Sequence, residues 1–342
     1  MTSSLKLCAK CVLPSTFPNI TFDQESVCNF CRKQETIDYR KFDATQKLEF
    51  DETLQRNKGV YQYDAICCYS GGKDSTYMLK MMIQDMGLNV LAYTLDNGFI
   101  TEQSKQNIKK VTTALSVDHV FYSPSPAFMK KMYVESMLGE LNKNRGSYKT
   151  RISDACLSCI SLVNTHAARM ALQMRIPMIF AGFTPGQIPR AVIKNGYRHY
   201  KETWETQKDH FMKTLGSEAD RFLNLREDGM DICQMSPFLV YEKSEKEILD
   251  SIRSLGWIYP ENLDGCSSNC ALNAVGNLCH EKKFGFHPYA FELSQLIRKN
   301  LLDRDEALAK LSANVNDQSL EETLEKLGLS RADLEKLASP RP

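Results

Sequence analysis

The stretch YSGGKDST at residues 69–76 constrains the fold more than any other part of the chain. The apolar run 65–69 predicts a buried strand, and residues 76–82 predict a helix that follows directly. Two glycines between them let the backbone bend tightly, and the first turn of a helix offers unpaired N–H groups at the positive end of its dipole. The sequence therefore predicts a strand, a turn and a helix that together bind a phosphate group.

Side chains of the same turn add donors for an oxyanion. Ser70 and Ser75 carry hydroxyls, and Lys73 carries a positive charge. The mononucleotide P-loop is excluded, because its glycines are spaced further apart and Ser or Thr follows its Lys, whereas Asp74 follows Lys73 here. A glycine turn that merely joins a strand to a helix is the alternative interpretation.

Residues 70–75 resemble the Ser-Gly-Gly-x-Asp-Ser signature of the PP-loop, or N-type, ATP pyrophosphatase superfamily. This resemblance implies that the loop holds the pyrophosphate of ATP, and that the enzyme makes an adenylate of its substrate and releases pyrophosphate. The ATP-binding residues would be Ser70, Gly71, Gly72, Lys73, Asp74 and Ser75. Lys73 and Asp74 would be catalytic, with Asp74 placed to bind Mg²⁺ together with the phosphates.

Composition sets broad limits. A chain of 342 residues has room for about two domains and a sizeable core. A net charge of +1 neither supports nor excludes nucleic acid as a partner. The first residues lack the apolar core of a signal peptide, and no apolar run approaches the roughly 18 residues of a membrane span. We therefore expect a cytoplasmic protein without a membrane partner, whose twelve cysteines serve metal binding or catalysis rather than disulfides.

Two Cys-x2-Cys pairs near the amino terminus predict a zinc ribbon with the ligands Cys8, Cys11, Cys28 and Cys31. A small domain of this kind is usually structural, since zinc binding acts as its folding energy. A role in binding a substrate or a partner is the alternative. The charged segment 32–58 predicts a helical connector to the next domain.

The residues around these ligands resemble the amino-terminal segment of the N-acetyl sugar amidotransferase family, which also carries a PP-loop. The resemblance rests on CAKCVLP at 8–14, ITFD at 20–23 and VCNFC at 27–31, and it covers about the first hundred residues. It implies amination of a nucleotide sugar or surface-glycan precursor with ammonia from a partner glutaminase.

Strands and helices alternate after the glycine turn. Short strands at 89–95, 119–122 and 177–181 with intervening helices predict a parallel, doubly wound α/β sheet. Ligands of such sheets bind beyond the carboxyl ends of the strands, where Asp96 follows one strand. Asp96 contacts the ribose or adenine of ATP in one interpretation and is a plain turn former in the other.

By resemblance to PP-loop enzymes, the loop containing Gly182 and Thr184 closes over the nucleotide phosphates, and Lys246 faces the adenylate. A solvated helix lysine is the alternative for Lys246. Residues 188–235 lack a clean periodicity and predict a lid or substrate insert, and the basic segment 142–151 predicts a mobile connection.

The predicted domains are a zinc ribbon with its connector at 1–45, a PP-loop ATP pyrophosphatase domain at 46–258, and a cysteine-bearing helical region at 259–342. The last region predicts four helices, at 289–299, 304–311, 320–327 and 331–337, with capping boxes at Ser319 and Ser330. We expect these helices to pack on the core or on another subunit of a homodimer and to carry no chemistry.

A further Cys-x2-Cys pair, Cys156 and Cys159, stands at a predicted helix start, where thiolates form easily. With Cys270 as a third thiolate, the pair resembles the ligands of cluster-dependent tRNA 2-thiouridine synthetases, which implies a [4Fe-4S] cluster with one open iron. Cys266 and Cys279 are alternative third ligands, and Cys67 and Cys68 are interpreted as strand packing. The amidotransferases lack such a pair, so the two resemblances point to different chemistries.

Three functions therefore stay open. Adenylation followed by attack of sulfur would thiolate a tRNA or a small metabolite and would need a sulfur donor. Attack of nitrogen would aminate a nucleotide sugar with a glutaminase partner. A non-catalytic nucleotide-binding protein would use the ribbon as its partner-binding module. The cysteine pattern favours the first.

Overall fold

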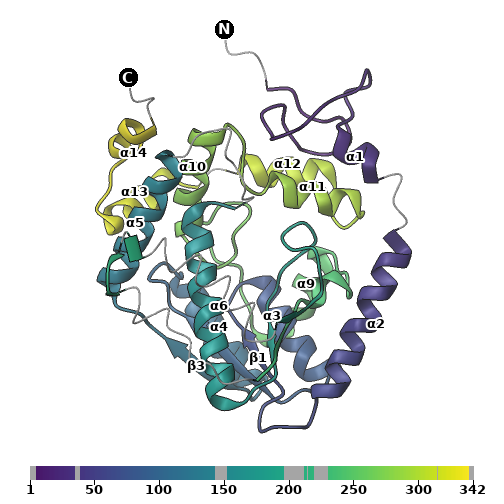
Figure 1. Ribbon diagram of the computed structural model, residues 1–342. Helices are drawn as coiled ribbons and strands as arrows, with labels where there is room; N and C mark the ends of the chain where they lie inside the picture. Colours follow the sequence, from purple (N-terminus) through teal and green to yellow (C-terminus); the bar gives the residue numbers. More distant parts are fainter. Residues whose placement is uncertain are drawn as a thin grey trace.

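The structure is a computed structural model that describes residues 5–34, 39–142, 152–195, 212–213, 215–218, 230–313 and 315–338. Residues 143–151 of the predicted basic segment lie outside the described part, as do 196–211 and 219–229 of the predicted insert. The chain forms a central sheet with helices on both faces, and an amino-terminal ribbon lies on helices from the carboxyl-terminal region (Figure 1).

The sheet has six strands in the order β3-β2-β1-β4-β6-β5. Neighbouring strands are parallel except β5, which is antiparallel to β6 at one edge. Because β2 and β3 lie on one side of β1 and β4 lies on the other, the strand order reverses between β1 and β4, where ligands of such sheets bind. The strands are β1 Ala65–Cys68, β2 Val90–Leu95, β3 Asp118–Tyr122, β4 Met178–Phe180, β5 Val192–Asn195 and β6 Ile232–Met235.

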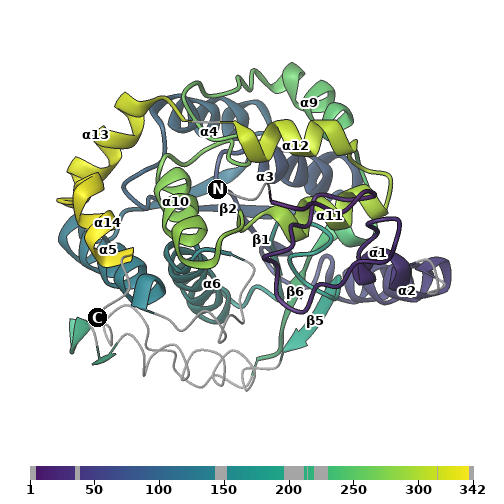
Figure 2. The same ribbon diagram turned by 90° about the horizontal axis from the view of Figure 1, so that it is seen from above.

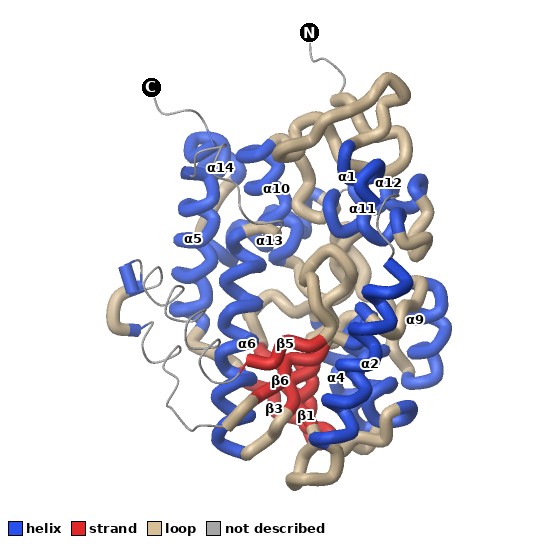
Figure 3. Tube along the Cα trace, turned by 45° about the vertical axis from the view of Figure 1, so that its right-hand side comes forward, coloured by secondary structure: helices blue, strands red, loops and turns tan. Residues whose placement is uncertain are grey.

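Alternate residues of each central strand face opposite layers, as the period of two requires. In β1, Ala65 and Cys67 belong to one apolar core, and Ile66 belongs to the other. Figure 3 shows the sheet between the two helical layers. One layer holds α2 Tyr39–Asn57, α3 Lys73–Lys80, α4 Glu102–Ala114 and α9 Glu245–Ile252. The other holds α5 Pro126–Asn142, α6 Asp154–Met174, α10 Leu272–Phe284, α13 Asp317–Leu327 and α14 Arg331–Ala338. The predicted doubly wound α/β fold is confirmed.

The ribbon packs on the last part of the chain rather than on the sheet. Its apolar residues, Phe17 among them, share one core with Phe286 and Phe291 of the carboxyl-terminal region. Helices α11 Ala290–Arg298 and α12 Arg304–Ser312 lie directly beneath it, and the short helix α1 Asn29–Gln34 ends it (Figures 1 and 2). In the described residues, no helix is both long and apolar enough to cross a membrane.

Two local expectations are wrong. The segment 188–235 was expected to be a lid or substrate insert, yet its ends form β5 and β6, and β6 pairs with β4 inside the sheet. Helix α13 begins before Ser319, because the Asn316 side chain accepts a hydrogen bond from the Gln318 N–H at 2.7 Å and caps it. The capping box at Ser330 is present, with reciprocal bonds to Asp333 of 2.8 and 3.2 Å.

Candidate active site

A cavity of about 400 Å³ opens at the carboxyl ends of β1 and β4. The glycine turn after β1 forms one wall, and the loop after β4 forms another. Cysteines of α6 and of the segment before α10 line a third part, and residues after β2 and of α9, α11 and α12 also contribute. The sequence-predicted residues that line it are Ser70, Gly72, Lys73, Asp74, Ser75, Cys156, Cys159, Gly182, Thr184 and Cys270.

The two glycines of the turn have different roles. Gly71 has a φ of +79°, which L-residues rarely adopt, and a Cβ there would lie 2.9 Å from the Ser104 carbonyl oxygen. Gly72 has an ordinary φ of −75°, but a Cβ would lie 2.8 Å from the Ser268 hydroxyl. Gly71 is therefore the glycine that is required for its backbone conformation. Gly72 is required because it has no Cβ, which would collide with the Ser268 side chain.

Hydrogen bonds fix the turn from inside and outside. The Ser75 hydroxyl donates to the Gly72 carbonyl at 3.1 Å and accepts from the Ser70 N–H at 3.2 Å. From the segment that follows α9, the buried Trp257 indole donates to the Gly71 carbonyl at 2.9 Å. The turn is thus held in one shape before any ligand arrives, which reduces the entropy lost on binding.

Charges alternate at the start of α3. Lys73 lies 2.8 Å from Asp74 and 3.6 Å from Glu245, which also accepts a hydrogen bond from Lys310 at 2.9 Å. Burial opposes the charge on Lys73, but the two carboxylates outweigh it and raise the pKa of Lys73. Lys73 therefore stays protonated inside the cavity and can bind a phosphate.

The three predicted cluster ligands come together from distant parts of the chain. Cys156 and Cys159 lie in the first turns of α6, and Cys270 lies just before α10. The Asn97 amide lies 3.2 Å from the Cys270 sulfur and 3.8 Å from the Cys159 sulfur. All three thiols line the cavity that the glycine turn also lines.

Burial changes the chemistry expected of these thiols. It raises the pKa of Cys270 to about 12 and also raises that of Cys156 and Cys159. For Cys159, the neighbouring Tyr133 hydroxyl and the hydrogen bond from the Asn97 amide oppose the rise in pKa. The expectation that the helix start makes thiolates easy to form is wrong, because desolvation outweighs it. A metal cluster bound here would have to displace protons.

The alternative third ligands differ in their surroundings. Cys266 lines the cavity, but its charged neighbours are Asp264, Glu292 and Lys310 rather than the other cysteines. Cys279 is buried beside Glu140 and is not among the lining residues. Cys67 is buried in the strand core, whereas Cys68 lines the cavity.

Two predicted site residues lie elsewhere. The Asp96 carboxylate accepts a hydrogen bond from the Gly98 N–H at 2.9 Å and so forms a turn, while the next residue, Asn97, lines the cavity. The Lys246 side chain is 87% exposed and pairs with Asp250 at 2.7 Å. It lines a separate open groove of about 690 Å³ outside the cavity, because α9 turns it outward. Its neighbour Glu245 faces inward instead.

The loop after β4 is held by the carboxyl-terminal region. Glu292 of α11 accepts hydrogen bonds from the Thr184 hydroxyl at 2.5 Å and from the Gln187 amide at 2.8 Å. Tyr289 and Lys310 line the same cavity. The expectation that these helices only pack is therefore wrong. Composition gave no signal for Glu292, since a single acidic residue on an amphipathic helix is common.

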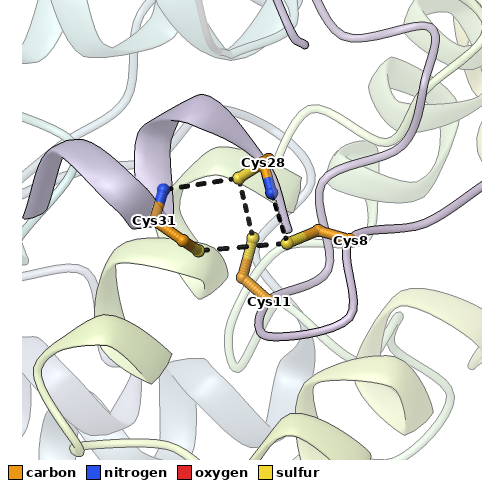
Figure 4. Close-up of side chains that lie close together, drawn as sticks. All are labelled: Cys8, Cys11, Cys28 and Cys31. Carbon is orange, nitrogen blue, oxygen red and sulfur yellow. Dashed lines mark hydrogen bonds between the residues drawn. The ribbon is translucent and has the colours of Figure 1, made fainter. Parts of the chain in front are cut away.

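The four amino-terminal cysteines form a separate, buried group (Figure 4). Their sulfur atoms all lie within 4.8 Å of one another, with Cys8–Cys31 at 4.0 Å and Cys11–Cys28 at 3.8 Å. Four sulfurs held tetrahedrally at about 2.3 Å from a zinc ion would lie about 3.8 Å apart, so the group fits one such ion. Backbone N–H groups of Cys28 and Cys31 donate to ligand sulfurs at 3.2 and 3.4 Å.

Comparison with known proteins adds a match at the carboxyl end. Residues 275–342 match the family described as "LPS biosynthesis protein WbpG-like, C-terminal domain". The last helices of this chain are therefore similar to that domain. The curated relative MJ1599 of Methanocaldococcus jannaschii, an uncharacterised protein, is 22% identical over 324 residues, which is 94% of this chain and 99% of the relative.

Solved structures that this chain resembles include two synthetases and a tRNA thiolase. The NMN synthetase of Francisella tularensis is 13% identical with a TM-score of 0.34 and aligns over 90% of this chain and 98% of its own. The U34-tRNA thiolase NcsA of Methanococcus maripaludis, solved with its [4Fe-4S] cluster, is 15% identical with a TM-score of 0.35 over 97% of this chain and 99% of its own. These are distant likenesses.

Proposed function

We propose that this protein uses ATP to adenylate an oxygen of an acceptor and then replaces that oxygen with sulfur. The single observation that supports this reaction is the meeting of Cys156, Cys159 and Cys270 in the cavity that the glycine turn lines. Adenylation and sulfur delivery need one enclosed space, since an activated intermediate in open water would hydrolyse.

The glycine turn would hold the phosphates of ATP. Lys73 would bind the phosphate oxygens, and Asp74 would hold Mg²⁺ beside them. The acceptor oxygen attacks the α-phosphorus, and pyrophosphate leaves with the electron pair of the broken P–O bond. Sulfur then attacks the acceptor carbon, and AMP leaves with the original oxygen. The cavity walls keep water from the adenylate between the two steps.

The three thiols fit a [4Fe-4S] cluster by number and chemistry. Sulfur is the ligand that iron–sulfur clusters require, and Asn97 can donate to ligated sulfur as it donates to the thiols now. Bound by three thiolates, such a cluster would leave one iron open to hold sulfide from a sulfur donor, and this sulfide would be the atom transferred. In the ribbon, Cys8, Cys11, Cys28 and Cys31 would hold one structural zinc ion.

Amination of a surface-glycan precursor is the second candidate. It is favoured by the match of residues 275–342 to a family of LPS biosynthesis proteins and by the amino-terminal resemblance to sugar amidotransferases. The same adenylate would form, but ammonia from a glutaminase would attack it. In that case Cys156, Cys159 and Cys270 would bind no iron.

Anaerobic purification followed by iron, sulfide and zinc analysis separates the two. The expected result is one zinc and about four irons with four sulfides per chain.

The Cys156→Ala, Cys159→Ala and Cys270→Ala variants should each lose the visible absorption of the cluster yet still bind ATP, because the glycine turn is built from other residues. Cys279→Ala is the matched control and should keep the cluster. A full cluster in all three variants, or zinc alone in the native protein, would overturn thiolation. Absence of AMP and pyrophosphate with every acceptor would instead favour a non-catalytic nucleotide-binding protein.

A further inference from the structure

Helix α11 separates the four-cysteine ribbon from the candidate active site and contacts both. In an α-helix, residues three and four positions apart lie on one face. Phe291, Ser294 and Arg298 therefore share one face, and Glu292 and Leu296 share another. Figure 2 shows the ribbon crossing over α11, and the sheet lies on the other side of the helix.

The first face of α11 binds the ribbon. Phe291 stacks on Phe17 with ring centres 5.6 Å apart and planes 13° from parallel. The Ser294 hydroxyl accepts a hydrogen bond from the Val12 N–H at 3.3 Å. Arg298 lies 3.7 Å from the sulfur of Cys31, one of the four grouped cysteines. A positive charge beside this sulfur is stabilised further when the sulfur becomes a thiolate on a metal ion.

The second face of α11 holds the loop after β4. Glu292 accepts hydrogen bonds from both Thr184 and Gln187, and this carboxylate is the point where the loop and the helix join. Between those two residues, Gly186 lies against the helix backbone with a φ of +99°, and a Cβ there would lie 3.1 Å from the Glu292 Cα. Loop and helix are therefore packed too closely to move independently.

We propose that Glu292 is a positioning residue, which holds the 182–187 loop in the geometry that binds ATP, and that the ribbon's metal ion sets the position of Glu292 through α11. The proposal rests on the proposed binding of ATP, but it holds for sulfur and nitrogen chemistry alike. The ribbon's apolar residues share their core with Phe286 and Phe291 rather than forming one of their own, so a metal ion on its four cysteines would contribute strongly to its fold. Without the ion, the ribbon contacts of Phe291, Ser294 and Arg298 are weakened, and Glu292 is no longer fixed opposite the loop.

A thermodynamic cycle tests this coupling in the full-length protein. ATP affinity is measured by calorimetry for the native chain and for Glu292→Ala, each with zinc and after chelation, with the chelator removed and Mg²⁺ restored. We expect Glu292→Ala and zinc removal each to weaken ATP binding about tenfold, and the two together to weaken it little more. Glu292→Gln, which keeps one acceptor oxygen, should lie between the native chain and Glu292→Ala.

Two measurements exclude a general loss of structure. Hydrogen exchange should rise in residues 182–187 after either change and stay unchanged in β1 and β2. Glu306→Ala, an exposed carboxylate on α12, is the matched control and should keep the native ATP affinity and its full response to zinc removal. Losses that simply add, or an ATP affinity that does not respond to zinc removal, would overturn the proposal. A native protein that binds no ATP at any zinc content would refute the proposed function instead.

Discussion

At the scale of single residues, the site depends on atoms that composition does not reveal. The signature identifies both Gly71 and Gly72, but only coordinates show that one is needed for its φ and the other for its missing Cβ. Asn97 is equally inconspicuous in sequence, although its amide lies near two of the three cavity thiols. Residue types alone predicted the glycine turn. They could not predict which residues contact the turn, because those neighbours belong to distant segments of the chain.

The different roles of the glycines give a testable contrast. Gly71→Ala should abolish pyrophosphate release and lower the free energy of unfolding, because an alanine is strained at a φ of +79° and also meets the Ser104 carbonyl. Gly72→Ala should lose activity with less effect on stability, since its only close neighbour below 3.0 Å is the Ser268 hydroxyl. Adding Ser268→Ala should restore part of the stability lost in Gly72→Ala and none of that lost in Gly71→Ala. Urea unfolding and a pyrophosphate assay measure both, and equal behaviour of the two alanine variants would contradict this assignment.

At the scale of elements, segments with strong hydrophobic periodicity were predicted well, whereas a short strand without such periodicity was missed. The glycine turn, the first three strands and the carboxyl-terminal helices lie where the sequence places them. The central strand β6 was missed, because four residues, ICQM, include a glutamine and show no alternation over a useful length. Its burial comes from pairing with β4, a long-range contact that local sequence does not encode.

The packing of α6 on the sheet includes a ring stack that predicts a pH dependence. His166 of α6 stacks on Tyr122 of β3 at 4.1 Å and on Tyr93 of β2 at 5.3 Å. Burial, with a smaller contribution from Arg169, lowers the pKa of His166 to about 4. The folded state thus binds its proton less readily than the unfolded state, whose pKa is near 6.5, so this contribution to stability is complete above pH 6.5 and is lost as the pH falls toward 4.

Replacement of the imidazole should remove this part of the pH dependence. Between pH 7 and pH 4, the free energy of unfolding of the native chain should fall by roughly 2–3 kcal/mol more than that of His166→Gln. Denaturant unfolding at a series of pH values measures the difference. Burial also lowers the pKa of His119 and of His287 in both proteins, so only the difference between the two curves reports on His166. Parallel curves would show that His166 does not carry the effect.

At the scale of the whole molecule, the amino-terminal ribbon contacts the carboxyl-terminal region, and the carboxyl-terminal region in turn contacts the candidate site on the sheet. The domains predicted at 1–45, 46–258 and 259–342 remain a prediction, but the contacts cross their limits. Arg304 donates hydrogen bonds to the carbonyls of Cys8 and Cys11 at 3.1 and 3.2 Å. On the other side of the same region, Glu292 reaches the loop after β4. No local pattern could have predicted this arrangement, because it depends on contacts between segments more than a hundred residues apart.

These shared contacts predict how the protein unfolds when the metal ion that we propose for the ribbon is removed. A ribbon with its own core would unfold alone, but Phe17 packs among Phe30, Phe286 and Phe291, so its core is half built from the carboxyl-terminal region. Chelation should therefore raise hydrogen exchange in α11 and α12 together with residues 5–34. Helices α13 and α14, which pack on α5 and α10, are the internal control and should keep their protection. Phe17→Ala should produce the same pattern with zinc present, because it empties the centre of the shared core. Exchange that rises in the ribbon alone would show that the two parts fold independently.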